Sequence, residues 1–320
     1  MAAFVSGGAG FIGVNLVRWL LEDGEQVIAA DNFVRGSRES LAELEDHPRF
    51  RLVEADLATE QGCAHAFEAA ADLGPIDEVW HLAANSDIPA GVADPRVDLR
   101  DTFLTTFEIL RQMRRAGTKR LLFASSSAIY GDFGDAELHE DIGPLVPISN
   151  YGAMKLASEA QAAAAAEDFL SHAVVFRFPN VVGAPATHGV ILEFIGRLQA
   201  DGAVLRVLGD GTQKKPFLHV SELIEAMLVA RARAPEGVRA YNIGPADDGV
   251  TVAWIAREVA ARISPSARLE FGQEPRGWLG DVPRFRYSIA RLAALGWTPE
   301  LSSEQAVKRA IEEIARQEGA

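Results

Sequence analysis

The 320-residue chain has little cysteine and no long apolar run. Its single cysteine, Cys63, excludes an internal disulfide and a cysteine-rich zinc site. One cysteine is also typical of a reducing compartment, so we expect a cytoplasmic protein. No stretch reaches 18 uninterrupted apolar residues and no positively charged leader precedes the first apolar segment, so we expect neither a membrane span nor a signal peptide.

The chain also lacks an excess of basic residues. It has 31 basic and 45 acidic side chains, which gives a formal net charge of −14. Nucleic acids and anionic lipid surfaces are captured largely by clustered lysine and arginine, so neither is an expected partner. An anionic small molecule remains compatible with this charge, because it needs only a few local cations.

What the chain does have is a regular alternation of short apolar runs and longer amphipathic stretches. Strands separated by helices of 10–20 residues predict a parallel sheet with helices on both faces, an α/β fold. The expected strands lie at 3–6, 26–30, 50–54, 78–82, 120–124 and 173–178, and the expected helices at 11–23, 37–46, 60–72, 93–116 and 150–170.

The pattern changes after Asn180, where helices near 189–201, 219–233, 250–263 and 302–317 alternate with proline- and glycine-rich connections. We therefore predict a Rossmann-type doubly wound sheet in residues 1–180, to which 217–244 return. Residues 181–216 and 245–320 are predicted to form a smaller α/β lobe on the C-terminal side.

Three glycines, Gly7, Gly10 and Gly13, stand between the first expected strand and the first expected helix. A dinucleotide pyrophosphate needs a tight turn, a backbone free of side chains and a helix N-terminus directed at the charge. Asp31 ends the second expected strand 18 residues after Gly13, where a carboxylate accepts hydrogen bonds from the adenine ribose. It would repel a 2′-phosphate, so NAD is favoured over NADP, although Arg35 weakens this preference slightly.

Asp56 follows the third expected strand and precedes a helix. Two interpretations stay open for it: with Leu57 it frames the adenine, or it is the N-cap of the helix.

Tyr151 and Lys155 stand at i and i+4 in an expected helix, so they share one face. An ammonium beside a phenol favours the phenolate, which can exchange a proton with a sugar hydroxyl. Such a pair is common on solvated helices, but here a run of serines, Ser125 to Ser127, follows the fifth expected strand. Hydroxyls at that end of a strand face the ligand crevice of a doubly wound sheet.

Together these motifs resemble the extended short-chain dehydrogenase/reductase family, in particular its nucleotide-sugar epimerases and dehydratases of the UDP-glucose 4-epimerase type. The resemblance spans nearly the whole chain. The residues that carry it are the glycine loop, Asp31–Asn32, His81–Ala84, the serine run, Tyr151-x-x-x-Lys155, Arg177–Gly183, Gly209–Gly211, Phe217–Val220 and Gly280–Asp281.

The resemblance implies site residues position by position. The catalytic group would be Ser126, Tyr151 and Lys155, with Ser125 and Ser127 as credible neighbours because a serine run is easily misaligned by one. The implied NAD-binding residues are Gly7, Gly10, Phe11, Ile12, Gly13, Asp31, Asn32, Asp56, Leu57, Leu82, Ala83, Ala84, Ser125, Tyr151, Lys155 and Pro179. The implied substrate-binding residues are Ser86, Ser126, Tyr151, Asn180, Val190, Lys215, Phe217 and Arg276.

The resemblance also narrows the reaction. Dehydratases of the family carry an Asp-Glu pair directly after the catalytic hydroxyl, whereas this chain has Ser127 and Ala128. The expected activity is therefore NAD-dependent 4-epimerisation of a nucleotide sugar, a UDP-hexose or UDP-hexuronic acid. An NDP-sugar dehydrogenase or 4-ketoreductase is the alternative enzyme, and a non-catalytic dinucleotide-binding module is the alternative from another class.

Some residues depart from the family pattern or suggest other roles. Thr102 and Glu108 stand where relatives often have asparagine. His81, His188 and His219 have no metal-ligand spacing, so no metal site is expected and His81 is expected to pack or to form hydrogen bonds. From the resemblance, we expect a homodimer formed through the helices at 93–116 and 150–170.

Overall fold

The computed structural model describes residues 1–71, 73–134, 136–274 and 286–320. The chain forms two compact units. Unit 1 comprises Met1–Gly131, Leu145–Arg177 and Met227–Tyr241, and unit 2 comprises Asp132–Pro144, Phe178–Ala226 and Asn242–Ala320. Residues 132–144 and 217–226 thus group with the second unit, and helix α8 (Val220–Arg233) contains the change from unit 2 to unit 1.

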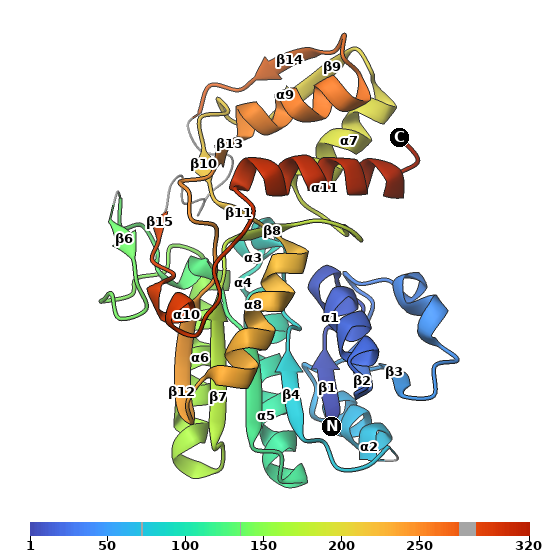
Figure 1. Ribbon diagram of the computed structural model, residues 1–320, viewed down its shortest axis with the longest axis vertical. Helices are drawn as coiled ribbons and strands as arrows, with labels where there is room; N and C mark the ends of the chain where they lie inside the picture. The colour runs from blue at the N-terminus through green and yellow to red at the C-terminus, as the bar shows by residue number, and fades with distance from the viewer. Residues whose placement is uncertain (72, 135, 275–285) are drawn as a thin grey trace. The chain divides into compact units, whose positions relative to one another are not determined.

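A seven-stranded sheet forms the centre of unit 1, in the order β12-β7-β5-β4-β1-β2-β3 (Figure 1). The pairings from β7 across to β3 are all parallel. The strand order reverses beside β1, so β1 and β4 flank the point where a doubly wound sheet binds its ligand. The strands are β1 (Ala2–Ser6), β2 (Gln26–Asp31), β3 (Phe50–Glu54), β4 (Glu78–His81), β5 (Arg120–Ala124), β7 (His172–Arg177) and β12 (Gly237–Asn242).

Both faces of this sheet are covered, which explains why its strands are apolar throughout rather than alternating. On one face, α2 (Glu60–Ala71), α5 (Thr105–Ala116) and α6 (Asn150–Asp168) share a core with residues such as Phe4, Val79 and Phe123. On the other face, α1 (Phe11–Glu22) and the end of α8 lie against the sheet. A Rossmann-type α/β fold is therefore confirmed.

Two predicted helices take other forms. Residues 93–116 do not make one α-helix: α3 (Ile88–Ala93) and α4 (Pro95–Asp98) precede a π-helical segment, η2 (Leu99–Leu104), which leads into α5. A π turn accommodates one extra residue and rotates the side chains that follow. The segment at 37–46 is a 3-10 helix, η1 (Arg38–Leu44), in which Leu41 is the buried residue.

Unit 2 is built around a separate core of helices α7 (Val190–Ala200), α9 (Val252–Ile263) and α11 (Ser303–Gln317). A fourth, short helix is α10 (Ala290–Ala294). The strands of unit 2 form two-stranded sheets: β8 (Asn180–Val182) with β11 (Phe217–His219), β9 (Val204–Val207) with β14 (Arg268–Phe271), β10 (Lys214–Lys215) with β13 (Val250–Thr251), and β6 (Glu137–Leu138) with β15 (Arg286–Tyr287).

Candidate active site

The glycine loop after β1 is built so closely that side chains do not fit in it. Gly7 has a left-handed φ of 71°, and a Cβ there would lie 2.8 Å from the backbone nitrogen of Ala83. A Cβ on Gly13 would lie 2.1 Å from the carbonyl oxygen of Gly7. The start of α1 therefore lies directly against the turn, which leaves backbone at its N-terminus where a pyrophosphate binds. These residues fit a dinucleotide, and Phe11 and Ile12 begin the helix as predicted.

Asp31 lies at the end of β2 and is already engaged by two backbone groups. Its Oδ2 accepts the Ala9 N–H at 3.0 Å and its Oδ1 accepts the Phe33 N–H at 2.8 Å. Burial raises the pKa of Asp31, and these hydrogen bonds act in the opposite direction. Each carboxylate oxygen keeps a second lone pair for a ribose hydroxyl. Asp31 thus fixes the glycine loop in addition to the predicted ribose role, while the next residue, Asn32, is exposed.

The loop after β4, which contains Leu82, Ala83 and Ala84, is held by Ser6. The Ser6 hydroxyl accepts the N–H groups of Leu82 and Ala83 at 3.1 and 3.3 Å and lies 2.8 Å from His81 Nδ1. His81 Nε2 lies 2.9 Å from the Thr106 hydroxyl. Burial, with a smaller effect of the Lys155 charge, lowers the pKa of His81 well below its usual value. Neutral, buried His81 therefore connects Ser6, which holds the loop after β4, to Thr106 of α5.

Asp56 is not the N-cap of α2. Its Oδ1 accepts the Ala58 N–H at 3.1 Å, and the Thr59 hydroxyl accepts the Gly62 N–H at 3.1 Å, which is the capping contact. The Asp56 carboxylate forms an ion pair with Arg100, and the adjacent Leu57 is buried. The predicted role of both residues at the adenine stays a prediction.

Ser126, Tyr151 and Lys155 come together at the carboxyl end of β5. Ser126 lies two residues after the end of that strand. Its hydroxyl accepts a hydrogen bond from the Ala128 N–H and forms another with the Tyr151 side chain. Lys155 Nζ donates to the Ala124 carbonyl at 2.7 Å and lies 5.8 Å from the centre of the Tyr151 ring. The i and i+4 spacing on α6 therefore places the amine near the phenol ring, and the phenol is hydrogen-bonded to Ser126.

Burial pushes both ionisable members of this group toward their neutral forms. Burial raises the pKa of Tyr151 to about 12. The negative charge of Asp98 also raises this pKa, whereas the hydrogen bond with Ser126 lowers it. Burial lowers the pKa of Lys155 to about 7, and the negative charge of Glu159 opposes this shift. The phenolate is thus formed most readily when the ammonium is beside it, because each charge offsets the cost of burying the other.

Two acidic residues near this group were not predicted. Glu159 lies one turn after Lys155 on α6. It is eight residues after Tyr151 and so lies on the same face of the helix, which is the sequence signal that could have indicated it. Asp98 acts on Tyr151 from the end of α4 and is fully buried, with Oδ1 accepting the Asn85 side-chain N–H at 2.8 Å. Nothing in the local sequence places Asp98 there, because the approach depends on how α4 packs against α6.

Most residues predicted to bind substrate lie in unit 2. Asn180 begins β8 and is exposed, Val190 begins α7, and Lys215 ends β10. Phe217 is a core residue of unit 2. Pro179, predicted to bind the cofactor, is buried in the same unit.

Ser86 belongs to unit 1, where its hydroxyl is exposed and accepts a hydrogen bond from Arg35 at 3.4 Å. Arg276 lies outside the described residues. The role of each of these positions in binding stays a prediction.

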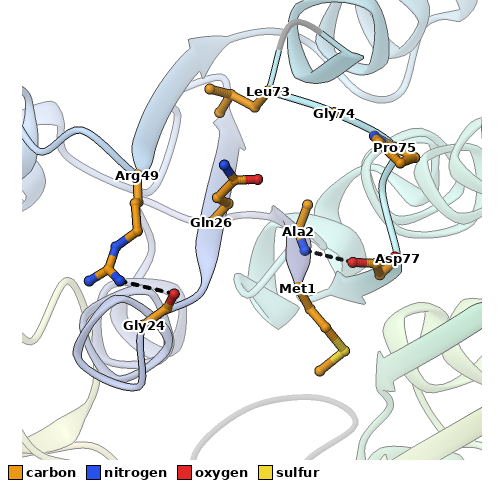
Figure 2. A pocket seen from close by; sticks show the side chains of 9 residues that line it. All are labelled: Met1, Ala2, Gly24, Gln26, Arg49, Leu73, Gly74, Pro75 and Asp77. Atoms are coloured by element: carbon orange, nitrogen blue, oxygen red, sulfur yellow. Dashed lines mark hydrogen bonds between the residues drawn. The ribbon is translucent and has the colours of Figure 1, made fainter.

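Other features of the described residues do not contribute to this site. They contain no group of three or more His, Cys, Asp or Glu that could hold a metal ion, and no helix among them is long and apolar enough to cross a membrane. A pocket of about 380 Å³ lies at the amino ends of β1 and β2, opposite the glycine loop. Figure 2 shows that its polar groups face one another: Arg49 donates to the Gly24 carbonyl, and Asp77 accepts the Ala2 N–H.

The glycine turn, the carboxylate ending β2 and the Ser-Tyr-Lys group all lie at the carboxyl edge of one doubly wound sheet. That combination defines a class, the dinucleotide-dependent α/β enzymes. The particular family follows from comparison: residues 3–244 match the model of the NAD dependent epimerase/dehydratase family. The chain belongs to this family, and NAD is its cofactor.

Known relatives and solved structures are similar to this chain over nearly its full length. A UDP-glucose 4-epimerase of Mycolicibacterium smegmatis is 28% identical and matches 98% of each chain. A crystal structure of UDP-galactose 4-epimerase is 34% identical, with a TM-score of 0.85 over 99% of each chain. A double mutant of DesIV, a dTDP-glucose 4,6-dehydratase of Streptomyces venezuelae solved with NAD, is 25% identical, with a TM-score of 0.86 over 99% of this chain and 97% of DesIV. Epimerases and dehydratases are thus both similar to this chain.

Proposed function

We propose that the protein is an NAD-dependent nucleotide-sugar 4-epimerase that acts on a UDP-hexose or UDP-hexuronic acid. The observation that carries this proposal is the composition of the group at the end of β5. Ser126, Tyr151 and Lys155 can move a proton to and from a sugar hydroxyl, and the two residues after Ser126 are Ser127 and Ala128. Neither can remove a C5 proton and expel a C6 hydroxyl, so proton transfer with reversible hydride transfer is the chemistry left to the site.

The chain's own residues have three tasks in this reaction. Tyr151, as a phenolate, accepts the proton of the sugar 4-hydroxyl, and Ser126 holds the same oxygen by a hydrogen bond. Lys155, held on the Ala124 carbonyl, keeps a positive charge beside the phenolate. When bound, the nicotinamide cofactor would supply a reversible hydride acceptor for C4.

The glycine loop, Asp31 and the Ser6-anchored loop after β4 hold the cofactor, because their backbone groups are fixed by the hydrogen bonds described above. Epimerisation then requires the 4-keto sugar to turn over, so that C4 takes back the hydride on its other face and the 4-oxygen takes back the proton. Asn180, Lys215 and Arg276 are proposed to hold the nucleotide diphosphate while the sugar turns, with Val190 and Phe217 beside the substrate. An epimerase of this kind never exchanges its cofactor during turnover.

Proton NMR tests the proposal directly. Purified protein is incubated separately with UDP-glucose, UDP-glucuronic acid and UDP-N-acetylglucosamine, with no cofactor added, and the anomeric region is followed. We expect a new anomeric signal that approaches an equilibrium ratio in one tube. Turnover that appears only with added NAD(H), and in proportion to it, would instead support an NDP-sugar dehydrogenase or 4-ketoreductase.

We also propose a homodimer. Leu99, Leu104 and Phe107 are large apolar side chains on η2 and α5 whose exposure is 45%, 37% and 39%. The neighbouring α6 is rich in alanine, which permits close helix packing. An exposed apolar group of this kind on packed helices is typical of a subunit interface.

A further inference from the structure

The carboxylate of Glu159 is a buried junction between three elements of unit 1. Its Oε1 accepts the Ser125 hydroxyl at 2.5 Å and the Arg177 Nε–H at 3.0 Å, and its Oε2 accepts an Arg177 terminal N–H at 2.6 Å. The side chains of Glu159 and Arg177 are 10% and 8% exposed. A bidentate pair that is shielded from water is far better defined than a surface ion pair.

The partners of Glu159 belong to the framework of the Tyr151 and Lys155 site. Ser125 directly follows Ala124, whose carbonyl accepts the Lys155 ammonium, and Arg177 is the last residue of β7. Arg177 also donates to the Tyr130 hydroxyl at 3.1 Å. Glu159 therefore ties α6 to the carboxyl ends of two adjacent strands, β5 and β7, and sets the rotation of the helix that carries Tyr151 and Lys155.

The charges around Lys155 make the same carboxylate important electrostatically. Tyr151 and Glu159 approach Lys155 from α6, neutral His81 approaches from β4, and Arg177 reaches Glu159 from β7. Burial disfavours the Lys155 ammonium, and the charge of Glu159 opposes that effect. Glu159 is thus the charge that favours the Lys155 ammonium against burial.

We propose that Glu159 is a positioning residue for the reaction, which fixes Ser125 and the register of α6 and keeps Lys155 charged beside Tyr151. It acts through Lys155, so the inference rests on the role proposed for Lys155 in catalysis. Glu159 itself need not touch the substrate or the cofactor.

Glu159→Gln keeps the shape of the side chain and removes its charge. The Lys155 ammonium then loses an attractive partner, so its pKa falls, by about one unit for a close charge. Because the phenolate of Tyr151 needs that ammonium, the alkaline limb of the kcat profile moves to lower pH by a similar amount, and kcat at alkaline pH falls about tenfold while KM changes little. Glu159→Asp, which retains the charge, should restore the pH limb.

Lysine-selective NMR measures the central claim without any turnover. The chain has five lysines, so protein labelled with ¹³C at lysine Cε gives few signals, and Lys155→Met assigns the one of interest. We expect the Lys155 titration midpoint to fall in Glu159→Gln and to stay within about 0.3 units of wild type in Tyr130→Phe, which alters the same network without changing charge. Bound NAD, released by acid and quantified, confirms that each variant is folded.

An unchanged Lys155 midpoint in Glu159→Gln would overturn the proposal, and so would an equal shift in Tyr130→Phe. If Glu159→Gln does not retain NAD, Glu159→Gln/Arg177→Gln removes both buried charges, and a downward shift is still expected because Glu159 is the charge that favours the Lys155 ammonium. An unshifted midpoint in the double variant would also overturn the proposal. The titration is independent of the substrate, so it is informative even if none of the UDP-sugars is epimerised.

Discussion

Asp31 illustrates how one side chain can serve structure and binding together. Its position at the end of β2 predicts a contact with the cofactor ribose. In the structure, both of its oxygens already accept backbone N–H groups, one of them from Phe33, which adopts a left-handed φ of 56°. The carboxylate therefore shapes the loop that we propose binds the cofactor. We expect that replacement of Asp31 would alter that loop as well as the preference for NAD over NADP.

Tyr151 is the residue whose loss should separate binding from chemistry. Tyr151→Phe removes the hydroxyl that we propose accepts and returns the proton, but it leaves the ring. We expect epimerisation to fall by at least about 10²-fold, the usual contribution of a positioned acid–base group. Bound NAD, measured after acid release, should match wild type. Activity within a few-fold of wild type would contradict the catalytic assignment.

At the scale of elements, the partly buried carboxylate of Glu313 is one of the polar contacts that join α11 to the rest of unit 2. Glu313 Oε2 lies 3.0 Å from His219 Nε2, and Glu313 Oε1 accepts the Arg309 Nε–H at 2.9 Å. Burial alone would raise the pKa of Glu313, but the hydrogen bonds and charges of these two partners outweigh burial and lower the pKa to about 2. The contact joins α11 to the end of β11.

The pKa of Glu313 is lower in the folded state than its unfolded value of about 4.5, so ionised Glu313 stabilises the folded state at pH values above 4.5. This contribution is lost as the pH falls toward 2. Glu313→Gln should therefore cost about 2–3 kcal/mol of unfolding free energy at pH 7. Urea unfolding at several pH values should show that the deficit narrows below pH 4.5. Glu312→Gln, which breaks an exposed pair with Arg262, should change stability by less than about 1 kcal/mol at any pH.

At the scale of the whole molecule, buried charges join segments that are distant in sequence. The Arg231 guanidinium lies 2.7 Å from Glu25 and 2.8 Å from Glu78, and all three side chains are at most 9% exposed. The cluster holds the end of α8 against the amino edges of β2 and β4. Glu78 also has a more distant cation, Arg120, whose Nε lies 3.6 Å away. Removal of Arg231 therefore leaves buried Glu25 without this ion pair and leaves Glu78 with only the more distant Arg120.

Arg231→Met should therefore lower the unfolding free energy by about 3–5 kcal/mol. Chemical denaturation at pH 7 measures the loss. Glu25→Gln/Glu78→Gln/Arg231→Met removes all three charges and should recover much of it. Arg114→Met, which breaks an exposed pair with Asp168, should cost less than about 1 kcal/mol. Equal losses in the two single variants would show that burial of the cluster is unimportant.

The proposed homodimer gives a second prediction at this scale. Leu104 and Phe107 are three residues apart, so they extend from neighbouring positions of the helix surface. Phe107→Asp introduces a charge into that apolar surface and should convert the dimer to monomer in sedimentation equilibrium. Leu208→Asp changes a more exposed apolar residue in unit 2 and should leave the assembly intact. A wild-type monomer would contradict the proposal outright.

Local sequence patterns were sufficient for part of the molecule. The alternation of strands and helices predicts the doubly wound sheet, because apolar periodicity and chain direction reflect burial on both faces. Gly7 and Gly13 predict the tight turn, since the backbone approach tolerates no Cβ. The i and i+4 spacing of Tyr151 and Lys155 predicts that they share a helix face. Each of these patterns can be read from residues close together in the chain, although the crowding at Gly7 comes from distant Ala83.

The sequence by itself determined the fold class, the glycine loop, and the pairing of Tyr151 with Lys155. Only the tertiary structure decided that Glu159 meets Ser125 and Arg177, that Asp98 acts on Tyr151, and that a π-helical segment interrupts residues 93–116. These contacts depend on which strands become neighbours and on how far each helix is rotated against the sheet. Both are set by packing over the whole core, and no local spacing encodes them.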